Sequence, residues 1–555
     1  MESRALLALE LPRVLEYLAG FTVSEPGRLA SLSMNPLCSV EEIQRQALLF
    51  EQGRLWTLRT NTRLAPFPTV DELLQFLSGG SAMADQEDLF ILRQLLAQGK
   101  EKVDAFLGDS PEEGSGDWPL WTSRCREMLM PVRSVSALSR CFNDDGLIRD
   151  EASPELSVVR GELRRLHRQC ARKVKDYDAE YNILHFLQDS FMTLSSDRYV
   201  LPLKANFKGR LQGVIHDFSQ TGETCYFEPL FLVELNNRLQ NLKRAEREEE
   251  RKILIFLSGL VRDELPGIRA LYDFLVELDL LFARVALAEC YDGRMVEFDE
   301  GRGVLLREAR HPLLELAASE KGRKALRQYA QWRSSLGEPM SGHFHDGGRD
   351  GEAANRIDAS QAGKRPDVKV VPSTLEILPG QQALVISGGN AGGKTVCLKA
   401  LGLIALMGMC ALPIPVDSGG VLPPWRRIHA FIGDDQSLED HVSTFTAQIR
   451  HLGRIWPDLS SASLVILDEF GAGTDPTQGA ALAQAVVDSL MEHGAYVAAA
   501  THFPALKAYA LSTQGVRAAS VLFDPASKKP LFRLVYDQVG ASQALDVARE
   551  HGLPE

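Results

Sequence analysis

Between Gly388 and Thr395, the chain combines glycines, one lysine and one hydroxyl residue at a spacing suited to binding phosphate groups. The segment reads GGNAGGKT, which is a glycine, four further residues and then Gly-Lys-Thr. Phosphate oxygens can approach backbone N–H groups closely only where no Cβ atom obstructs them, and glycine also adopts the backbone angles of such a loop. We expect Lys394 to place its charge beside the β- and γ-phosphates of ATP, and Thr395 to ligate Mg²⁺. The predicted phosphate-binding residues are Gly388, Gly389, Asn390, Ala391, Gly392, Gly393, Lys394 and Thr395.

Two acidic residues further along the chain supply groups that could hydrolyse the bound nucleotide. Asp468 and Glu469 directly follow the apolar run Leu464 to Leu467. Acids at the end of a buried strand are costly unless something pairs with them. We expect Asp468 to hold Mg²⁺, directly or through water, and Glu469 to polarise the attacking water. The run AYVAAATH ends in His502, which is placed to reach the γ-phosphate from another strand.

The elements around these residues predict how they are brought together. The strand-like segment ALVIS precedes the glycine loop, and the helical segment TVCLKALGLIALM follows it. Strands that alternate with helices and carry functional residues at their ends indicate a parallel α/β sheet. A glycine-rich turn that carries a lysine by chance is the alternative interpretation, and the acid pair on a second strand argues against it.

A long helical arm with a β-rich tip is the second feature that the sequence predicts. Ser153 and Pro154 are a helix start signal, and helical spacing continues to about Ser190. Alternating β-branched or aromatic and polar residues then fill 197–229, before a second helical stretch from Leu230 to about Tyr291. A helix of about 35 residues reaches some 50 Å, which is too long for a compact domain to enclose. The predicted domains are a helical core 1–152, an ascending helix 153–196, a β module 197–229, a descending helix with its return to the core 230–316, a flexible insertion 317–368 and the α/β domain 369–555.

Basic residues on the arm could bind nucleic acid. Lys204, Lys208 and Arg210 cluster in the β module and are interleaved with Tyr199 and Phe207. Such cations could neutralise phosphates without reading bases. The module also carries acids, and the arginines of the preceding helix could equally form a solvated face. We therefore expect the tip cluster to be the nucleic-acid site.

Composition restricts the class of protein. The 555 residues are 45% hydrophobic and 24% charged, which is typical of a water-soluble chain with sizeable cores. A net charge of −13 argues against a uniformly basic nucleic-acid coat. The eight cysteines are scattered without a Cys-x-x-Cys pair, and the acidic N-terminus is unlike a signal peptide. The longest apolar run, Ala400 to Leu412, is too short to cross a membrane. We predict a cytoplasmic protein that makes no membrane contact.

Taken together, these motifs resemble the MutS family of ATPases, and they are most similar to its second bacterial subfamily. The resemblance rests on GGNAGGKTVCLKALGLIALM, GDDQSLEDHVSTFTAQI, LVILDEFGAGTDPTQGAALAQAVV, THFPALKAYA, DGLIRDEASPEL and RYVLPLKANFKGRLQGVIHD. It implies an ABC-like P-loop ATPase domain with a mostly parallel sheet. An all-α core and lever domain precedes it, with a long antiparallel helical arm that carries a small β clamp module.

The resemblance further implies a homodimer in which each ATP site is completed by the partner subunit, with Ser443 near the γ-phosphate. ATP binding and hydrolysis would drive the arms to open and close around branched or distorted DNA, in DNA repair and control of recombination. The chain departs from the family in its Gly-Gly-Asn-Ala loop, where Gly-Pro-Asn-Thr is usual, and the missing proline makes the loop less preorganised. No C-terminal Smr nuclease domain or mismatch-reading wedge domain is found in this sequence, so we expect neither nuclease activity nor direct mismatch recognition.

Three other functions remain open from the sequence. The subfamily resemblance is also compatible with action on stalled or collided ribosomes, with ribosomal RNA as a partner. A structural coiled-coil ATPase that tethers proteins would need a much longer arm. An inactive scaffold would bind nucleotide without turning it over.

Overall fold

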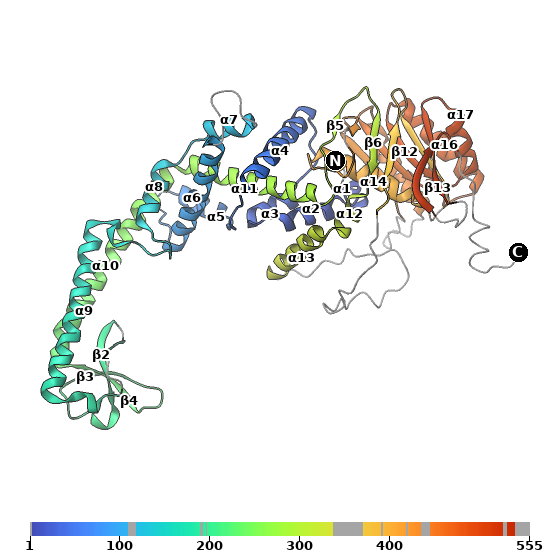
Figure 1. Cartoon of the computed structure of the whole chain (residues 1–555). Coiled ribbons are helices and arrows are strands. Elements are labelled where there is room, and N and C mark those ends of the chain that lie inside the picture. Colours follow the sequence, from blue (N-terminus) through green and yellow to red (C-terminus); the bar gives the residue numbers. More distant parts are fainter. Residues whose placement is uncertain are drawn as a thin grey trace. The chain divides into compact units, whose positions relative to one another are not determined.

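The computed structural model describes residues 3–80, 82–108, 118–188, 192–195, 197–336, 370–389, 392–417, 420–433, 444–524 and 530–538 (Figure 1). Contacts divide the chain into two compact units. Unit 1 consists of Met1–Pro68, Gly108–Arg124 and Val276–Glu555, and unit 2 consists of Thr69–Leu107 and Cys125–Leu275. Within the described residues, no helix combines the length and the apolar character that a membrane span requires.

A six-stranded sheet forms the centre of unit 1. Its strands, in spatial order, are β10 (Arg427–Phe431), β11 (Ser463–Asp468), β12 (Tyr496–Thr501), β8 (Ala383–Ser387), β13 (Val516–Phe523) and β14 (Pro530–Tyr536). The first five strands are parallel, and β14 is antiparallel to β13. The four strands from β10 to β8 are almost entirely buried, as expected where helices cover both faces. The predicted mostly parallel sheet is confirmed.

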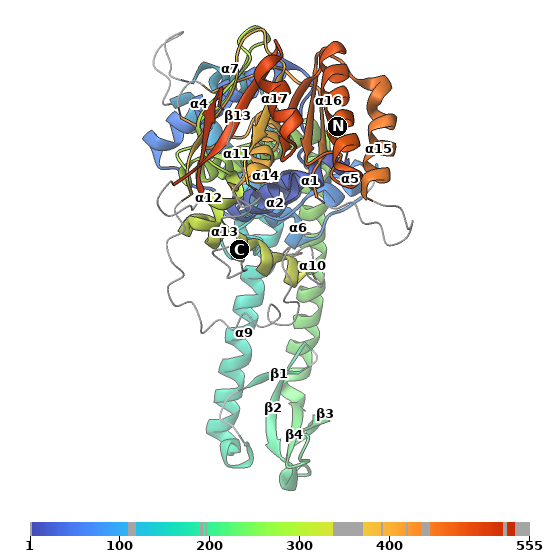
Figure 2. The same cartoon turned by 90° about the vertical axis from the view of Figure 1, so that its right-hand side faces the viewer.

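Helices pack on both faces of this sheet (Figure 2). The helices that follow its strands are α14 (Lys394–Met409), α15 (Thr444–Ile455), α16 (Pro476–Glu492) and α17 (Pro504–Ser512). Successive strand residues point to opposite faces, so Leu384 packs in the core that contains α14, whereas Val385 packs in the core that contains α16 and α17. Helix α14 is held closely, since a Cβ at Gly402 would lie 2.6 Å from side-chain atoms of Leu9 and Ile466.

A smaller sheet extends unit 1. Its order is β5 (Glu297–Phe298), β9 (Val421–Leu422), β6 (Val304–Ala309) and β7 (Ser373–Ile377). Strands β5 and β6 come from the segment that the sequence analysis assigned to the return of the second long helix. Strand β7 contacts β8 and β14 of the large sheet. The smaller sheet therefore joins β5 and β6, which lie well upstream of residue 369, to the same compact unit.

The helical core predicted for 1–152 is divided between the two units, and several of its helices belong to unit 1. They are α1 (Ser3–Ala8), α2 (Leu11–Phe21), α3 (Glu25–Leu32), α4 (Val40–Thr60) and the start of α7 (Pro119–Glu127). Helices α12 (Pro312–Ala318) and α13 (Glu320–Ser335) pack with α2.

The prediction that 317–368 is a flexible insertion is wrong for its first part. Residues 320–335 form α13, whose N-cap residue Ser319 accepts a hydrogen bond from the Gly322 amide. Ala325 and Tyr329 are buried, so one face of this very polar helix is covered by protein. The polar composition concealed a narrow apolar stripe at helical spacing. Residues 337–368 lie outside the described residues.

The close approach of α13 to α2 can be tested at Gly20. A Cβ at Gly20 would lie 2.0 Å from the carbonyl oxygen of Ala325, and a backbone atom cannot move aside cheaply. We expect Gly20→Ala to destabilise unit 1 by about 1–3 kcal/mol, as overpacked cores usually do. Differential scanning calorimetry measures the effect as a lower Tm of the first transition. The control is Gly161→Ala on helix α9 (Pro154–Tyr181), where an added Cβ would have no neighbouring atom within 4 Å, and it should be neutral or slightly stabilising. Similar effects of the two substitutions would contradict the packing.

Unit 2 contains the arm. Helix α9 (Pro154–Tyr181) and helix α10 (Leu230–Asp263) lie side by side, and a β module follows α9 (Figures 1 and 2). The module is the sheet β1 (Thr193–Ser195), β2 (Arg198–Lys204), β4 (Thr224–Pro229) and β3 (Gly213–Phe218), and its paired strands are antiparallel. The remaining helices of this unit are α5 (Asp71–Ser78), α6 (Gln86–Gly108) and α8 (Val132–Cys141). Helix α11 (Leu265–Glu289) belongs to this unit as far as Leu275.

The ends of the arm helices differ in part from the sequence-based expectation. Helix α9 starts at Pro154, where the Ser153 side chain caps it, but it stops at Tyr181 because Asn182 adopts a left-handed conformation. The expected stretch from Leu230 to about Tyr291 is two helices with a break at Glu264. Pro266 explains the break, since proline lacks the amide proton that a helix interior requires. The Glu264 carboxylate accepts hydrogen bonds from the Ser134 amide and hydroxyl at 2.8 and 2.7 Å, which fixes the break against α8.

Candidate nucleotide site and family

The glycine loop joins the end of β8 to the start of α14. Gly393 has φ of +86°, a backbone conformation that favours glycine, and a Cβ there would lie 3.0 Å from the Phe532 ring. A Cβ at Gly392 would lie 3.2 Å from Val521. A Cβ at either position would lie unusually close to these side chains, and at Gly393 the backbone conformation also disfavours one. Gly388 and Gly389 precede them in the described chain, whereas Asn390 and Ala391 lie outside the described residues.

Lys394 is the first residue of α14 and points back along the loop. Its side chain is only 3% exposed, and Nζ donates a hydrogen bond to the Gly388 carbonyl at 2.9 Å. The same nitrogen lies 3.6 Å from Glu469 Oε1. The ammonium group thus lies between the glycine loop and the acid pair, which the sequence placed on separate strands.

Thr395 and Asp468 are in direct contact. Thr395 Oγ1 donates a hydrogen bond to Asp468 Oδ2 at 2.7 Å. The second carboxylate oxygen, Oδ1, is buried and has no hydrogen-bond partner within the described residues. Burial raises the pKa of Asp468, because the charged form loses hydration. A hydroxyl oxygen beside a carboxylate with an unsatisfied oxygen is a donor set that suits Mg²⁺, so these residues fit that ion.

The register of the sheet explains how the strand ends meet. Strand β12 lies between β11 and β8, with Asp468 opposite Ala500 and Thr501 opposite Ser387. Parallel strands end at the same edge of a sheet, which is where α/β proteins bind ligands. The site therefore lies at the carboxyl ends of these three strands.

Glu469 and His502 lie just beyond that edge. Glu469 has φ of +50°, which is uncommon for a side chain other than asparagine or aspartate, and its amide donates to the Ala500 carbonyl at 3.0 Å. His502 Nδ1 lies 3.8 Å from Glu469 Oε1, and the His502 side chain is 44% exposed. The structure thus brings Lys394, Glu469 and His502 together. Ser443, the residue inferred to face the partner's nucleotide, lies outside the described residues.

A cavity beside the loop was missed by the sequence analysis. It has a volume of about 240 Å³ and is lined by Gly393, Val396, His311, Val371 and Phe532, among others. Burial lowers the pKa of His311 to about 4, so this ring is neutral at pH 7. The sequence signal for this cavity was a histidine directly before the proline that starts α12. Nothing in the sequence, however, connects residue 311 with residue 393.

The tip cations lie on the β module of unit 2. Lys204 ends β2, and its Nζ donates to the His185 carbonyl at 3.3 Å, whereas Lys208 and Arg210 are exposed in the following turn. Neither Lys208 nor Arg210 forms an ion pair within the part of the chain that the structure describes.

Two acids of the β module, Asp197 and Glu228, are paired with other cations. Asp197 binds Lys243 and Arg247, and the buried Glu228 binds Arg198 and His216. On α9, Arg160 binds Asp150, Glu246 and Glu250, so it joins α9 to α10 instead of facing outward.

Comparisons with known proteins agree with this architecture. The profile of MutS domain V matches residues 384–555. The whole chain is similar to Endonuclease MutS2 of Maridesulfovibrio salexigens (47% identical over 555 residues) and of Solidesulfovibrio magneticus (48% over 564 residues). It is also similar to Endonuclease MutS2 of Bacillus velezensis, at 30% identity over 556 residues. The alignments cover 100% of this chain and 65%, 65% and 64% of those relatives, so the chain spans slightly less than two thirds of their length. On the sequence match along its whole length, together with the phosphate loop and acid pair that the fold brings together, this chain belongs to the MutS2 family.

Proposed function

We propose that the chain binds and hydrolyses ATP with Mg²⁺, and that this cycle opens and closes a homodimeric clamp around branched or distorted DNA in the cytoplasm. The observation that carries the ATPase proposal is the Thr395–Asp468 pair, in which Thr395 directly follows the glycine loop and Lys394, and in which one buried carboxylate oxygen has no hydrogen-bond partner within the described residues. A buried acid in this position is costly unless a cation completes its surroundings.

Each residue of the site has a separate part in the proposed reaction. The backbone amides of the glycine loop and Lys394 bind and orient the phosphates, and Thr395 and Asp468 would hold Mg²⁺. When bound, Mg²⁺ supplies neutralisation of the charge that develops on the phosphate oxygens. Glu469 accepts a proton from the attacking water and orients it, and His502, next to Glu469, donates a hydrogen bond toward the γ-phosphate. The largely apolar cavity beside Gly393 and Phe532 supports binding of the adenine ring there.

The arm supports the clamp part of the proposal. Helix α9 has 28 residues and the β module already begins at Thr193, so this helix is much shorter than a coiled-coil tether requires. This short arm disfavours the coiled-coil tether. The exposed Lys208 and Arg210 are suited to phosphate contacts of a duplex, which depend on charge and shape and not on base sequence. All eight cysteines lie in described residues and none forms a disulfide, in keeping with a reducing cytoplasm.

The proposed clamp predicts that the tip cations contribute to DNA affinity. We expect the triple variant Lys204→Gln, Lys208→Gln, Arg210→Gln to bind a four-way junction about tenfold more weakly at moderate salt. The slope of log K against log salt should become shallower by about 1 for each lost phosphate contact. Fluorescence anisotropy with branched and linear duplexes at several salt concentrations, with and without ATP, measures both quantities.

A matched control removes three exposed cations of α13 in unit 1, as Arg323→Gln, Lys324→Gln and Arg327→Gln. This control should leave junction binding within twofold of the wild type. Equal losses in the two triple variants would contradict the tip site. If purified ribosomes, tested under the same conditions, bind tightly while both duplexes bind weakly, the DNA clamp is refuted in favour of the ribosome as target.

A further inference from the structure

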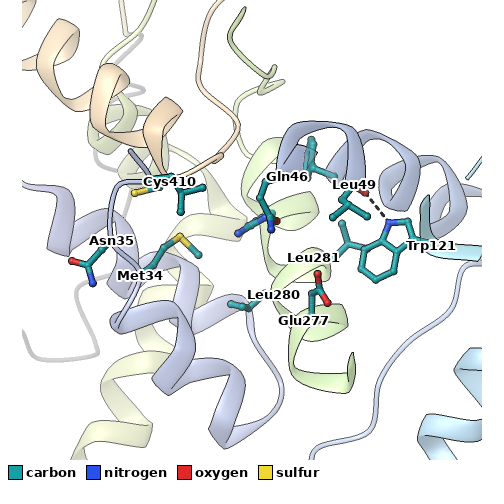
Figure 3. Close-up of a pocket in the computed structure, with 12 residues that line it drawn as sticks. Met34, Asn35, Gln46, Leu49, Trp121, Glu277, Leu280, Leu281 and Cys410 are labelled. Atoms are coloured by element: carbon teal, nitrogen blue, oxygen red, sulfur yellow. Dashed lines mark hydrogen bonds between the residues drawn. The ribbon is translucent and has the colours of Figure 1, made fainter. Parts of the chain in front are cut away.

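A second cavity in unit 1 lies away from the phosphate loop (Figure 3). It has a volume of about 200 Å³. Apolar side chains form most of its wall, including Leu49, Leu281 and Trp121 on one side and Met34 on the other. Trp121 is fixed by a hydrogen bond of 2.8 Å from its indole nitrogen to the Leu49 carbonyl. The cavity is somewhat larger than engineered apolar cavities of about 150 Å³ that bind benzene.

Arg284 supplies a positive charge to this cavity. Its side chain lies deep in the protein, so burial lowers its pKa, and the partial exposure that it retains fits a side chain that lines the cavity. Within the described part of the chain, Arg284 forms no hydrogen bond and no ion pair, and its Nε is buried. A buried guanidinium is normally hydrogen-bonded on several sides, because it carries five N–H donors.

The acid that acts electrostatically on Arg284 does not satisfy its charge. Glu277 also lines the cavity, but Arg124 donates to its Oε1 at 2.6 Å and forms an ion pair with its Oε2. Arg45 also acts electrostatically on the same carboxylate. One glutamate is therefore shared by three arginines, which leaves an excess of positive charge around the cavity.

We propose that this cavity is a binding site for a small organic anion, in which Arg284 binds the carboxylate and the apolar wall encloses the rest of the molecule. The size admits a single aromatic ring or a short branched chain with one acidic group. An anion of this kind would provide Arg284 with the acceptors that the chain does not provide. An inorganic anion would satisfy Arg284 but would leave the apolar wall without a partner.

Calorimetric titration of the 555-residue chain with benzoate tests the proposal. Benzyl alcohol serves as a neutral aromatic probe, and inorganic phosphate serves as an anion that has no apolar part. We expect benzoate to bind at least tenfold more tightly than either of the other two. Arg284→Met should weaken benzoate binding at least tenfold and change binding of benzyl alcohol less than twofold. The variant should keep or raise the Tm, since methionine fills similar space without a buried charge.

The control is Arg63→Met, which removes an exposed arginine of unit 1 that does not line the cavity and should leave benzoate affinity within twofold. A crystal of the wild-type chain soaked with 4-bromobenzoate provides a test that needs no variant, and the bromine should lie inside the cavity. The proposal is overturned if none of the probes binds at millimolar concentration, if benzyl alcohol or phosphate binds as tightly as benzoate, or if the bromine lies elsewhere.

Discussion

Replacing Lys394 with alanine is expected to abolish ATP binding at micromolar protein concentrations. The Lys394 ammonium is buried between the Gly388 carbonyl and Glu469, so in the proposed complex it contacts phosphate out of bulk water. Truncating one partner of a buried charge pair costs about 2–5 kcal/mol. A loss of about 2–4 kcal/mol in binding free energy corresponds to an affinity that is roughly 30- to 1000-fold weaker. Equilibrium titration with a fluorescent ATP analogue measures the Kd.

Lys399→Ala is the matched control for this prediction. Lys399 lies on the same helix and pairs with Glu10 at 3.2 Å, away from the glycine loop. Its loss should leave the Kd for ATP within about twofold, because partly exposed ion pairs contribute only about 0–1 kcal/mol. An unchanged Kd in Lys394→Ala would remove the phosphate loop from the proposed function.

Replacing Glu469 with glutamine is expected to stop turnover while ATP still binds. Glutamine has nearly the same shape, but its amide cannot accept the proton of the attacking water. General-base catalysis contributes about 10²–10⁴-fold to rates, so kcat should fall by at least about 100-fold. Steady-state phosphate release gives kcat, and the same fluorescent titration gives the Kd. The Kd should change less than about threefold because, within the described residues, Glu469 accepts no hydrogen bond from the loop amides.

The two effects are distinguishable because they act on different quantities. Lys394→Ala should lose binding, and Glu469→Gln should lose only the chemical step. Glu492→Gln, an exposed substitution at the end of α16, serves as control and should retain both. Turnover in Glu469→Gln that equals that of the wild type would exclude this residue as the base, whatever the result at Lys394.

Much of the nucleotide site was predictable because its chemistry is local in sequence. A glycine loop followed by lysine and threonine needs no tertiary information to be identified, and neither does an acid pair at the end of an apolar run. The parallel sheet then places Asp468 beside Thr395, since both lie at the carboxyl edge. Ser153 likewise indicated the start of α9 correctly, because an N-cap acts on its own helix.

Other features depend on contacts between distant segments, which periodicity alone does not report. Helix α13 is so polar that its covered face, with Ala325 and Tyr329, consists of very few apolar residues. Strand β6 was missed because a short apolar run has no period that separates a strand from part of a helix. The cavity around Arg284 could not be predicted either, since its wall combines residues near 34, 121 and 281 with Cys410.

Helix α14 connects the nucleotide site at one of its ends with the cavity of Arg284 at the other. Lys394 begins it at the glycine loop, and Cys410, which caps its last turn, lines the cavity of Arg284. Gly402 allows this helix to pack in close contact with its neighbours, so the helix resists sliding along its own axis. If occupancy of one end changes affinity at the other, thermodynamic reciprocity requires an equal factor in both directions. An organic acid and ATP would then be mutual effectors, joined by one rigid segment.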